Sequence, residues 1–246
     1  MQSKNNAADG AYRGLAVAIK ARMKQAADEG YVVFDEGGGG LKGPLFVRNS
    51  GEQVSKDKAV QLKAFYEEIR ECVKCRLGET RNNFVFGEGD PEAKLVFIGE
   101  APGADEDEQG RPFIGRAGQL LTKIIESIDL KREQVFILNV LKCRPPDNRA
   151  PEPEEVVQCR PYLEKQLEII KPHIICTLGN PSTHLLLNTE VGISKLRGTK
   201  QDYKGILVIP TYHPSACLRN PNLKVDVWKD VKLIRKEYDR LCVSRN

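Results

Sequence analysis

Several residues that can do chemistry stand where the chain leaves short apolar runs. Glu100 follows the run 95–98, Asn139 lies near the end of 135–140, Asn180 follows 174–178, and His213 follows 206–209. A carboxylate accepts hydrogen bonds, an amide both donates and accepts, and a neutral imidazole does one at each nitrogen. Side chains of these types suit general acid–base work and the stabilisation of developing charge on a polar ligand.

Cysteines form a second candidate site. Cys72 and Cys75 make a C-x2-C pair, and Cys143 and Cys159 lie in and beyond a proline-rich segment. Four thiolates can close a tetrahedral zinc site or hold an iron–sulfur cluster, and the spacing does not separate the two. A redox pair and scattered structural thiols remain alternatives. Cys176 lies inside an apolar run, where a free thiol behaves as a small hydrophobe.

The elements that position these residues follow from hydrophobic patterning. Continuous apolar runs typical of strands buried on both faces occupy 95–98, 135–140, 174–178 and 206–209. Helical spacing of apolar residues occupies 62–69, 120–128, 154–170, 181–187 and 224–241. This alternation predicts an α/β fold, a three-layer α/β/α arrangement with a four-stranded, mostly parallel central sheet. Ligands bind beyond the carboxyl ends of such strands, so we expect the four strand ends to converge on one crevice.

The first part of the chain differs in composition. Residues 1–57 predict a helical, partly flexible N-terminal extension with a four-glycine run at 37–40, and residues 58–246 predict the folded domain. A phosphate-binding glycine loop is excluded because no Lys-Ser/Thr follows the glycines.

Composition limits the class of protein. Hydrophobic residues make up 40% and charged residues 29% of the 246 residues, which is typical of a globular protein. No apolar run reaches the roughly 20 residues of a membrane helix, and no secretory signal is visible. Seven cysteines without an export signal favour a reduced, cytoplasmic compartment over a disulfide scaffold. The formal net charge of +4 is too small to prove a polyanionic partner and does not oppose one.

Four strings in order carry a resemblance to a known family. They are GEAPG at 99–103, RPFIG at 111–115, LNVLKCRPP at 138–146 and HPS at 213–215. Together with the cysteines they resemble the family 4 uracil-DNA glycosylases over about residues 59–241. The resemblance implies a base-excision repair enzyme that flips uracil out of DNA and hydrolyses its N-glycosidic bond to leave an abasic site. It implies uracil-containing DNA, double- or single-stranded, as the substrate, and we expect a monomer, nucleoid-associated through its function.

The resemblance also implies a [4Fe-4S] cluster. By motif position its ligands are Cys72, Cys75, Cys143 and Cys159. Such a cluster is structural in the family, and it would tie the proline-rich loop to the helix that precedes the first strand.

Base recognition falls, by the same resemblance, on three side chains. Phe113 stacks on the extruded ring, Asn139 accepts from uracil N3–H and donates to O4, and His213 hydrogen-bonds O2 as charge develops. Backbone N–H groups around Ala101 and Gly103 are expected near the base, in a tight turn.

A carboxylate near the sugar would orient water or stabilise positive charge. Glu100 is the first candidate, and Asp105 and Asp107 follow. An acidic run is typically a solvated face, and we expect this of Glu106 and Glu108.

DNA contacts are expected from basic residues near the crevice and from one apolar wedge. Leu218 would fill the vacated stack, beside Ser215 of the HPS string. The candidate phosphate-binding residues are Arg111, Arg116, Lys142, Arg144 and Arg219.

Two alternative functions stay open at this point. The acidic run with His213 could bind Mg²⁺ and hydrolyse a phosphoester, which EDTA would abolish. A non-catalytic iron–sulfur module could bind DNA without releasing uracil.

Overall fold

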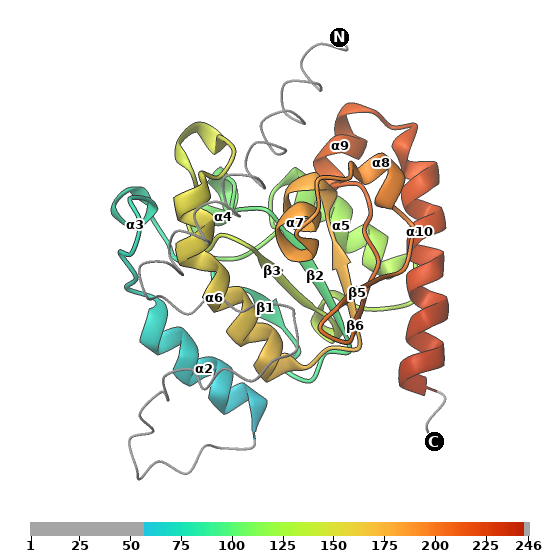
Figure 1. Ribbon diagram of the computed structural model, residues 1–246, viewed down its shortest axis with the longest axis horizontal. Coiled ribbons are helices and arrows are strands. Elements are labelled where there is room, and N and C mark those ends of the chain that lie inside the picture. The colour runs from blue at the N-terminus through green and yellow to red at the C-terminus, as the bar shows by residue number, and fades with distance from the viewer. Residues whose placement is uncertain (1–56, 244–246) are drawn as a thin grey trace, which may run out of the picture.

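A single mixed sheet organises the molecule. The structure is a computed structural model that describes residues 57–243, so the predicted N-terminal extension and its glycine run lie outside the described residues. The described strands form one six-stranded sheet in the order β1-β3-β2-β4-β6-β5 (Figure 1). The strands are β1 (Glu88–Gly89), β2 (Leu95–Gly99), β3 (Phe136–Asn139), β4 (Ile174–Thr177), β5 (Gln201–Tyr203) and β6 (Ile206–Val208).

The four strands predicted from apolar runs are the parallel centre of this sheet. β2 pairs with β3 on one side and β4 on the other, and β4 pairs with β6, all in parallel. The prediction of four strands is wrong at the edges, where β1 and β5 pair antiparallel with β3 and β6. These edge strands hold two and three residues. They lack a continuous apolar run, because an edge strand is not covered on both faces.

Helices cover both faces of the sheet. The described α-helices are α2 (Lys58–Ile69), α3 (Leu77–Thr80), α4 (Ala104–Gln109), α5 (Arg116–Glu126), α6 (Pro153–Ile170), α7 (Gly179–Leu187), α8 (Ile193–Leu196), α9 (Pro214–Arg219) and α10 (Leu223–Tyr238). Val96 and Ile98 of β2 belong to the core shared with α2, α6 and α7, whereas Leu95 and Phe97 belong to the core shared with α5, α9 and α10. The predicted three-layer arrangement is therefore confirmed.

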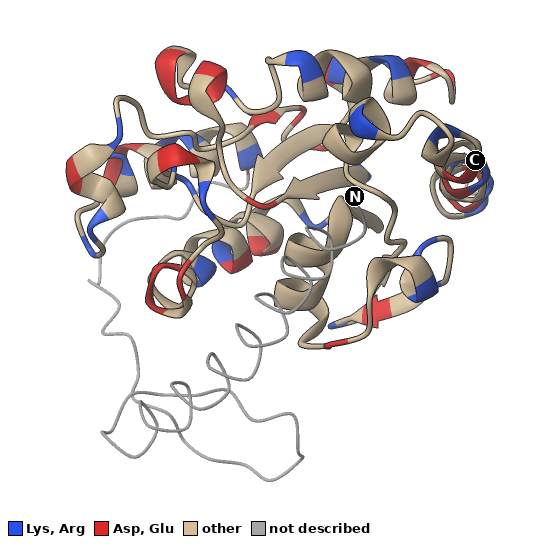
Figure 2. Ribbon diagram, turned by 90° about the horizontal axis from the view of Figure 1, so that it is seen from above, with Lys and Arg blue, Asp and Glu red and all other residues tan. Residues whose placement is uncertain are grey.

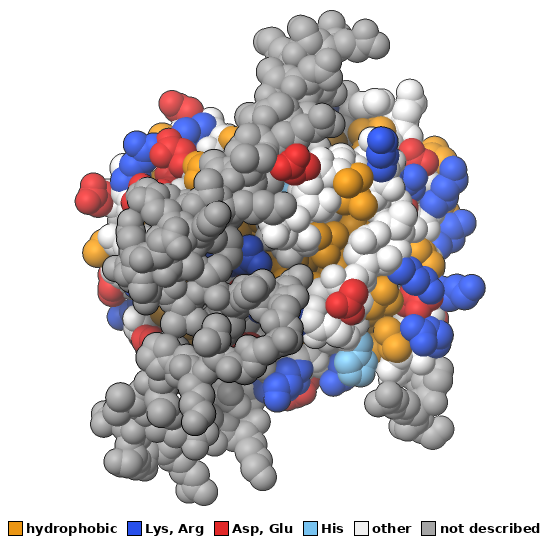
Figure 3. Space-filling view, viewed as in Figure 1, with side chains coloured by type: hydrophobic (Ala, Val, Ile, Leu, Met, Phe, Trp, Pro, Cys, Tyr) orange, Lys and Arg blue, Asp and Glu red, His pale blue; other side chains and the backbone are white. Residues whose placement is uncertain are grey.

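Charge lies on the outer layers. Figure 2 shows Lys, Arg, Asp and Glu mostly on helices and loops around a largely uncharged sheet. On the face drawn in Figure 3, Lys and Arg side chains gather along the edge where α10 lies. Within residues 57–243, each helix is too short or too polar to cross a lipid bilayer.

Local sequence explains the helix that carries one of the four cysteines. α6 begins at Pro153, whose fixed φ and missing N–H suit a first helical turn. Glu155 reaches back to accept from the Glu152 backbone N–H at 2.8 Å, which is the reciprocal half of a capping box. The helix then runs to Ile170 and presents Cys159 to the core of its face of the sheet.

Candidate active site

Two side chains that follow strands, Asn139 and His213, and one loop side chain, Phe113, lie near Gly99 at the end of β2. A Cβ atom on Gly99 would lie 2.3 Å from Asn139 Oδ1 and 2.5 Å from Phe113 Cζ, so only glycine leaves room for both. The Phe113 ring centroid is 5.6 Å from that of His213, at an interplanar angle of 36°. A Cβ atom on Gly179, after β4, would lie 3.1 Å from the Cβ of His213. These residues lie together as the convergence of strand ends predicts, and we call this group of residues the strand-end slot.

Asn139 brings an unpaired acceptor to the slot. The residue ends β3 and is 1% exposed, and its Oδ1 atom has no hydrogen-bond partner among the described residues. Leaving a buried acceptor unpaired costs about 1–3 kcal/mol. A ligand with an N–H donor in the slot would recover that free energy.

His213 is held in one tautomer by the helix that follows it. Its Nδ1 accepts from the Ser215 backbone N–H at 3.1 Å and lies 2.8 Å from Ser215 Oγ, so His213 is the N-cap of α9. With Nδ1 an acceptor, a neutral ring carries its proton on Nε2. Burial lowers the pKa of His213 to about 4, and the charge of Arg219 acts in the same direction. At neutral pH the ring is therefore uncharged and has an Nε2–H to donate.

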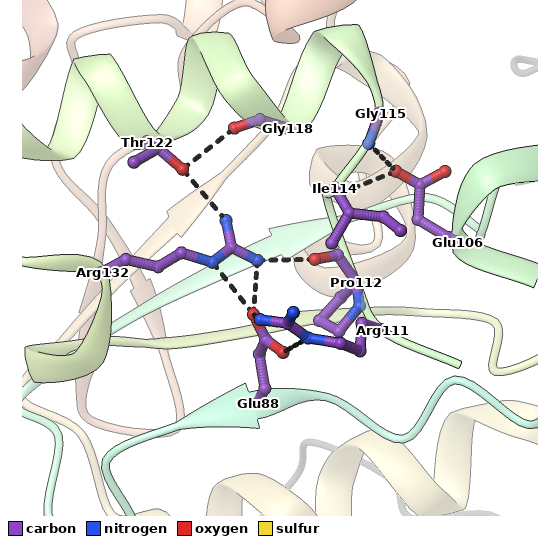
Figure 4. A network of polar contacts seen from close by, with 9 residues as sticks. All are labelled: Glu88, Glu106, Arg111, Pro112, Ile114, Gly115, Gly118, Thr122 and Arg132. Atoms are coloured by element: carbon purple, nitrogen blue, oxygen red, sulfur yellow. Dashed lines mark hydrogen bonds and ion pairs between the residues drawn. The ribbon is translucent and has the colours of Figure 1, made fainter. Parts of the chain in front are cut away.

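The loop that carries Phe113 is fixed on one side by an ion-pair network (Figure 4). Phe113 has a φ of 50°, a conformation that non-glycine residues adopt at a cost. Arg132 donates to the Pro112 carbonyl at 2.6 Å and pairs with Glu88 at 2.7 Å, while Arg111 pairs with Glu88 at 2.8 Å. Burial raises the pKa of Glu88, but its bonds to the two arginines hold it below the ordinary value. Glu88 is thus an anion that anchors both arginines.

Glu106 fixes the same loop on its other side. One carboxylate oxygen accepts the backbone N–H groups of Ile114 at 2.9 Å and Gly115 at 3.0 Å (Figure 4). The other accepts the Gly103 N–H at 3.1 Å, which joins the GEAPG turn to the RPFIG loop. The expectation that Glu106 is solvated is therefore wrong, whereas Glu108 is exposed as predicted. A glutamate three residues after the N-cap Gly103, which can accept the N-cap N–H as in the reciprocal half of a capping box, is the signal that could have found it.

The two aspartates of the acidic run 105–108 contact different parts of the molecule. Asp107 is 2% exposed and accepts the backbone N–H groups of Asn82 at 3.0 Å and Asn83 at 3.3 Å, so it faces another loop. Asp105 lies toward the Phe113 loop, because a Cβ on Gly115 would be 2.4 Å from Asp105 Oδ2. The structure therefore brings Asp105, and not Asp107, beside the loop of the strand-end slot.

Glu100 follows β2 directly and is half-buried. Its backbone carbonyl accepts from Leu141 N at 3.0 Å, so this turn stays attached to the segment after β3. No group of three or more His, Cys, Asp or Glu side chains within residues 57–243 is spaced to hold a metal ion.

The candidate DNA contacts differ in accessibility. Arg116 and Arg219 are exposed, and Leu218 is 39% exposed, as a wedge would have to be. Arg111 is exposed but already paired with Glu88. Lys142 is 0% exposed, so the expectation that it binds phosphate is wrong.

The cysteine set adjoins the same part of the chain, because Cys143 follows Asn139 in the segment after β3. It consists of four thiols, Cys72, Cys75, Cys143 and Cys159. The pKa of Cys143 is raised to about 11 and that of Cys159 to about 12, chiefly by burial. Neighbouring thiols of the set act in the same direction, against the opposing effects of Arg81 and Lys142. The four side chains are therefore close enough to interact. As free thiols Cys143 and Cys159 stay protonated at neutral pH, and a bound metal would ionise them.

Hydrogen-bond donors surround the sulfurs of this set. Tyr162 Oη donates to Cys72 Sγ at 3.1 Å, the backbone N–H of Lys142 to Cys159 Sγ at 3.3 Å, and Arg81 to Cys143 Sγ at 3.4 Å. Donors of this kind stabilise anionic sulfur in iron–sulfur sites.

Comparison with known proteins gives one consistent family. The sequence profile of the uracil DNA glycosylase superfamily matches residues 86–232. A type-4 uracil-DNA glycosylase from Sulfurisphaera tokodaii is 50% identical over 185 residues, 71% of this chain and 84% of the relative. The type-4 enzyme of Saccharolobus solfataricus is 48% identical over 69% and 83% of the two chains. That of Archaeoglobus fulgidus is 46% identical over 68% and 88%.

Proposed function

This chain belongs to the uracil DNA glycosylase superfamily, among its type-4 enzymes, and from that premise we propose how its strand-end slot works. The protein is a uracil-DNA glycosylase of base-excision repair. Its substrate is uracil-containing DNA, and it acts as a monomer in the cytoplasm, at the nucleoid. The observation that carries the mechanism is the meeting of Phe113, Asn139 and His213 around Gly99.

Recognition in the slot rests on one amide and one ring. Asn139 Oδ1 accepts from uracil N3–H, and the Asn139 amide donates to O4. Cytosine presents the reverse pattern on that edge, so a group of the amide would stay unpaired. Phe113 stacks on the base, a contact that contributes about 1–3 kcal/mol. Ala101 follows Glu100 in the adjoining turn and offers its backbone to the base, whereas the Gly103 N–H is bonded to Glu106.

Cleavage needs stabilisation of charge on both sides of the N-glycosidic bond. The C1′–N1 bond breaks with its electron pair leaving on uracil, and water adds its hydroxyl to C1′ while its proton passes to the solution or the base. His213 Nε2–H donates to uracil O2 as negative charge develops, an effect worth about 3 kcal/mol. Glu100 orients the water and stabilises the positive sugar, with Asp105 as the second carboxylate.

Extrusion of the base is assisted from outside the slot. Leu218 enters the vacated stack, and Arg116, Arg219 and Ser215 hold the flanking backbone. Unstacking costs a few kcal/mol, and less for a mismatch or a single strand. Arg111 contributes to DNA binding as the outer member of the Glu88 network.

The cysteine set holds a [4Fe-4S] cluster in this proposal. Cys72, Cys75, Cys143 and Cys159 are its ligands, supported by the donors around their sulfurs and by the type-4 relatives. When bound, the cluster supplies a structural cross-link between the segment after α2, the loop after β3 and α6.

Release of uracil is the direct test of the activity. We expect single- and double-stranded oligonucleotides with one uracil to give free uracil and abasic sites, cut only after alkali treatment. Because no step uses a divalent ion, brief exposure to EDTA should leave the rate unchanged. Loss of activity in EDTA with restoration by Mg²⁺, or binding without uracil release, would instead support one of the alternative functions.

Metal content tests the cluster separately. We expect about four iron atoms per chain and a brown protein that absorbs at about 400 nm, through sulfur-to-iron charge transfer. The measurement is elemental analysis with an absorption spectrum of anaerobically purified protein. A colourless protein that contains zinc and is fully active would refute the cluster.

The Glu106 contacts predict a large effect of a small change. Glu106→Gln replaces one acceptor oxygen with an NH₂ group, so the loop N–H groups or the Gly103 N–H lose their partner. We expect kcat/KM to fall about 10²-fold, because a small displacement of Phe113 misplaces the base. Single-turnover kinetics on a uracil oligonucleotide measure this. Glu108→Gln, two residues away on the exposed face, is the matched control and should match the parent. Equal rates for both variants would contradict a positioning role for Glu106.

A further inference from the structure

Lys142 is a charged side chain buried inside the protein. Its side chain is 0% exposed. Along the chain it lies between Asn139, which is proposed to bind the base, and Cys143, the next residue. An ammonium group taken out of water costs several kcal/mol unless opposite charge and hydrogen bonds compensate. Neither DNA nor solvent can supply that compensation at this depth, so the partners of Lys142 must lie within the protein.

The contacts of Lys142 point in two directions. Its Nζ donates to the Asn139 backbone carbonyl at 2.8 Å, three residues back along the chain. Its backbone N–H donates to Cys159 Sγ at 3.3 Å, and its carbonyl accepts from Val85 N at 2.8 Å. One residue thus connects the end of β3 to the cysteine set.

The charges that face the ammonium group are sulfurs. Two cysteines of the set adjoin Lys142, because its backbone N–H donates to Cys159 Sγ and Cys143 follows it directly in the chain. Protonated thiols carry no charge and would leave the ammonium uncompensated, whereas thiolates bound to iron are anionic. The burial of Lys142 is therefore accounted for when the cysteine set is occupied by a negatively charged centre.

We propose that Lys142 is a positioning residue that serves, together with Arg81, as a counter-charge of the cluster and holds the Asn139 carbonyl in place. The inference rests on the proposed cluster and goes beyond it, because it links the cluster to base recognition. A shift of the Asn139 backbone moves its Oδ1, which already lies so close to Gly99 that no Cβ would fit between them. Loss of the Lys142 bond therefore weakens uracil binding as well as the cluster.

Two variants separate charge from hydrogen bonding. Lys142→Met keeps most of the volume but removes both, while Lys142→Gln keeps a donor on a chain one bond shorter. The matched control is Lys58→Met, since Lys58 Nζ also donates to a backbone carbonyl, that of Ile170 at 2.8 Å, outside the strand-end slot. Two quantities are measured on the holoenzyme. The first is the loss of iron, followed as decay of the 400 nm absorbance in the iron chelator bathophenanthroline, which should be about 10–100-fold faster for both Lys142 variants. The second is inhibition of the enzyme by free uracil.

The expected pattern is specific to the proposal. Both Lys142 variants lose iron faster than the parent, but uracil inhibition weakens about 10-fold in Lys142→Met and less in Lys142→Gln, while Lys58→Met matches the parent in both. A Lys142→Met protein with parental iron loss and parental uracil inhibition would overturn the proposal while leaving the enzyme and its cluster intact. An iron-free parent would overturn the cluster and with it the counter-charge.

Hydrogen exchange keeps the proposal testable if neither variant folds. The Val140 and Leu141 amides donate to the Gly99 and Glu100 carbonyls, beside the Lys142 bond. In the parent enzyme, removal of iron should lower their protection more than that of amides in β6. Unchanged protection of Val140 and Leu141 would overturn the link between the cluster and the strand end.

Discussion

Replacing Asn139 with alanine is expected to abolish the preference of the enzyme for uracil over cytosine. A site whose buried polar groups match one base edge discriminates by about 10⁴–10⁵ against a base that leaves them unpaired. Asn139 supplies the buried, unpaired Oδ1 at the slot, and alanine has no polar group there. We therefore expect kcat/KM for uracil to fall by a factor close to that discrimination of about 10⁴–10⁵. Single-turnover release of the base from matched uracil and cytosine oligonucleotides measures this.

The controls for Asn139→Ala separate recognition from folding. The variant should keep parental affinity for DNA that already contains an abasic site, because those contacts do not involve the base. Asn222→Ala changes an asparagine before α10 whose side chain makes no cap, and it should behave as the parent. Unchanged uracil kinetics in Asn139→Ala would refute the assignment of this residue.

His213→Asn is expected to lower kcat about 10²–10³-fold with little change in KM. Removing one donor to a developing oxyanion has a cost of this size. Asparagine is a good N-cap, so α9 keeps an acceptor for the Ser215 N–H while the distant Nε2–H is lost. The variant therefore isolates the donor from the cap. The control is His173→Asn, which should match the parent. The ring of His173 lies 3.4 Å from Cys242 Sγ.

The pH dependence gives a second measurement on His213. With its pKa lowered to about 4 by burial, the ring is neutral above that value and becomes a cation only as pH falls through it. Nuclear magnetic resonance titration should therefore find no protonation of His213 near pH 6.5. Protonation would place a hydrogen on Nδ1 and break the cap on α9, so activity should be lost at the lower pH. A His213 that titrates near 6.5, with activity following it, would contradict the neutral-donor role.

The centre of the fold is readable from local pattern. The runs 95–98, 135–140, 174–178 and 206–209 are apolar except for Thr177 and Asn139, because helices cover both sheet faces. Parallel strands place their carboxyl ends on one edge, so the polar residues after those runs had to lie near one another. The positions of Asn139 and His213 follow from that argument. Phe113 was predicted from the RPFIG string at 111–115, through the family resemblance.

The remaining features depend on contacts between residues far apart in the sequence. Glu106 and Asp107 are neighbours in one acidic run, yet one bonds the Phe113 loop and the other the loop at Asn82. Lys142 resembles any basic residue near a DNA-binding site until its burial is known. The Arg132 contact with Pro112 joins residues 20 positions apart, and no periodicity marks such a pair.

A crystal structure of the protein with free uracil bound tests the central claim most directly. The account predicts one uracil in the strand-end slot, stacked on Phe113, with N3–H on Asn139 Oδ1 and O2 within hydrogen-bond distance of His213 Nε2. Uracil bound elsewhere, or bound in the slot with Asn139 and His213 turned away from its polar edge, would contradict it.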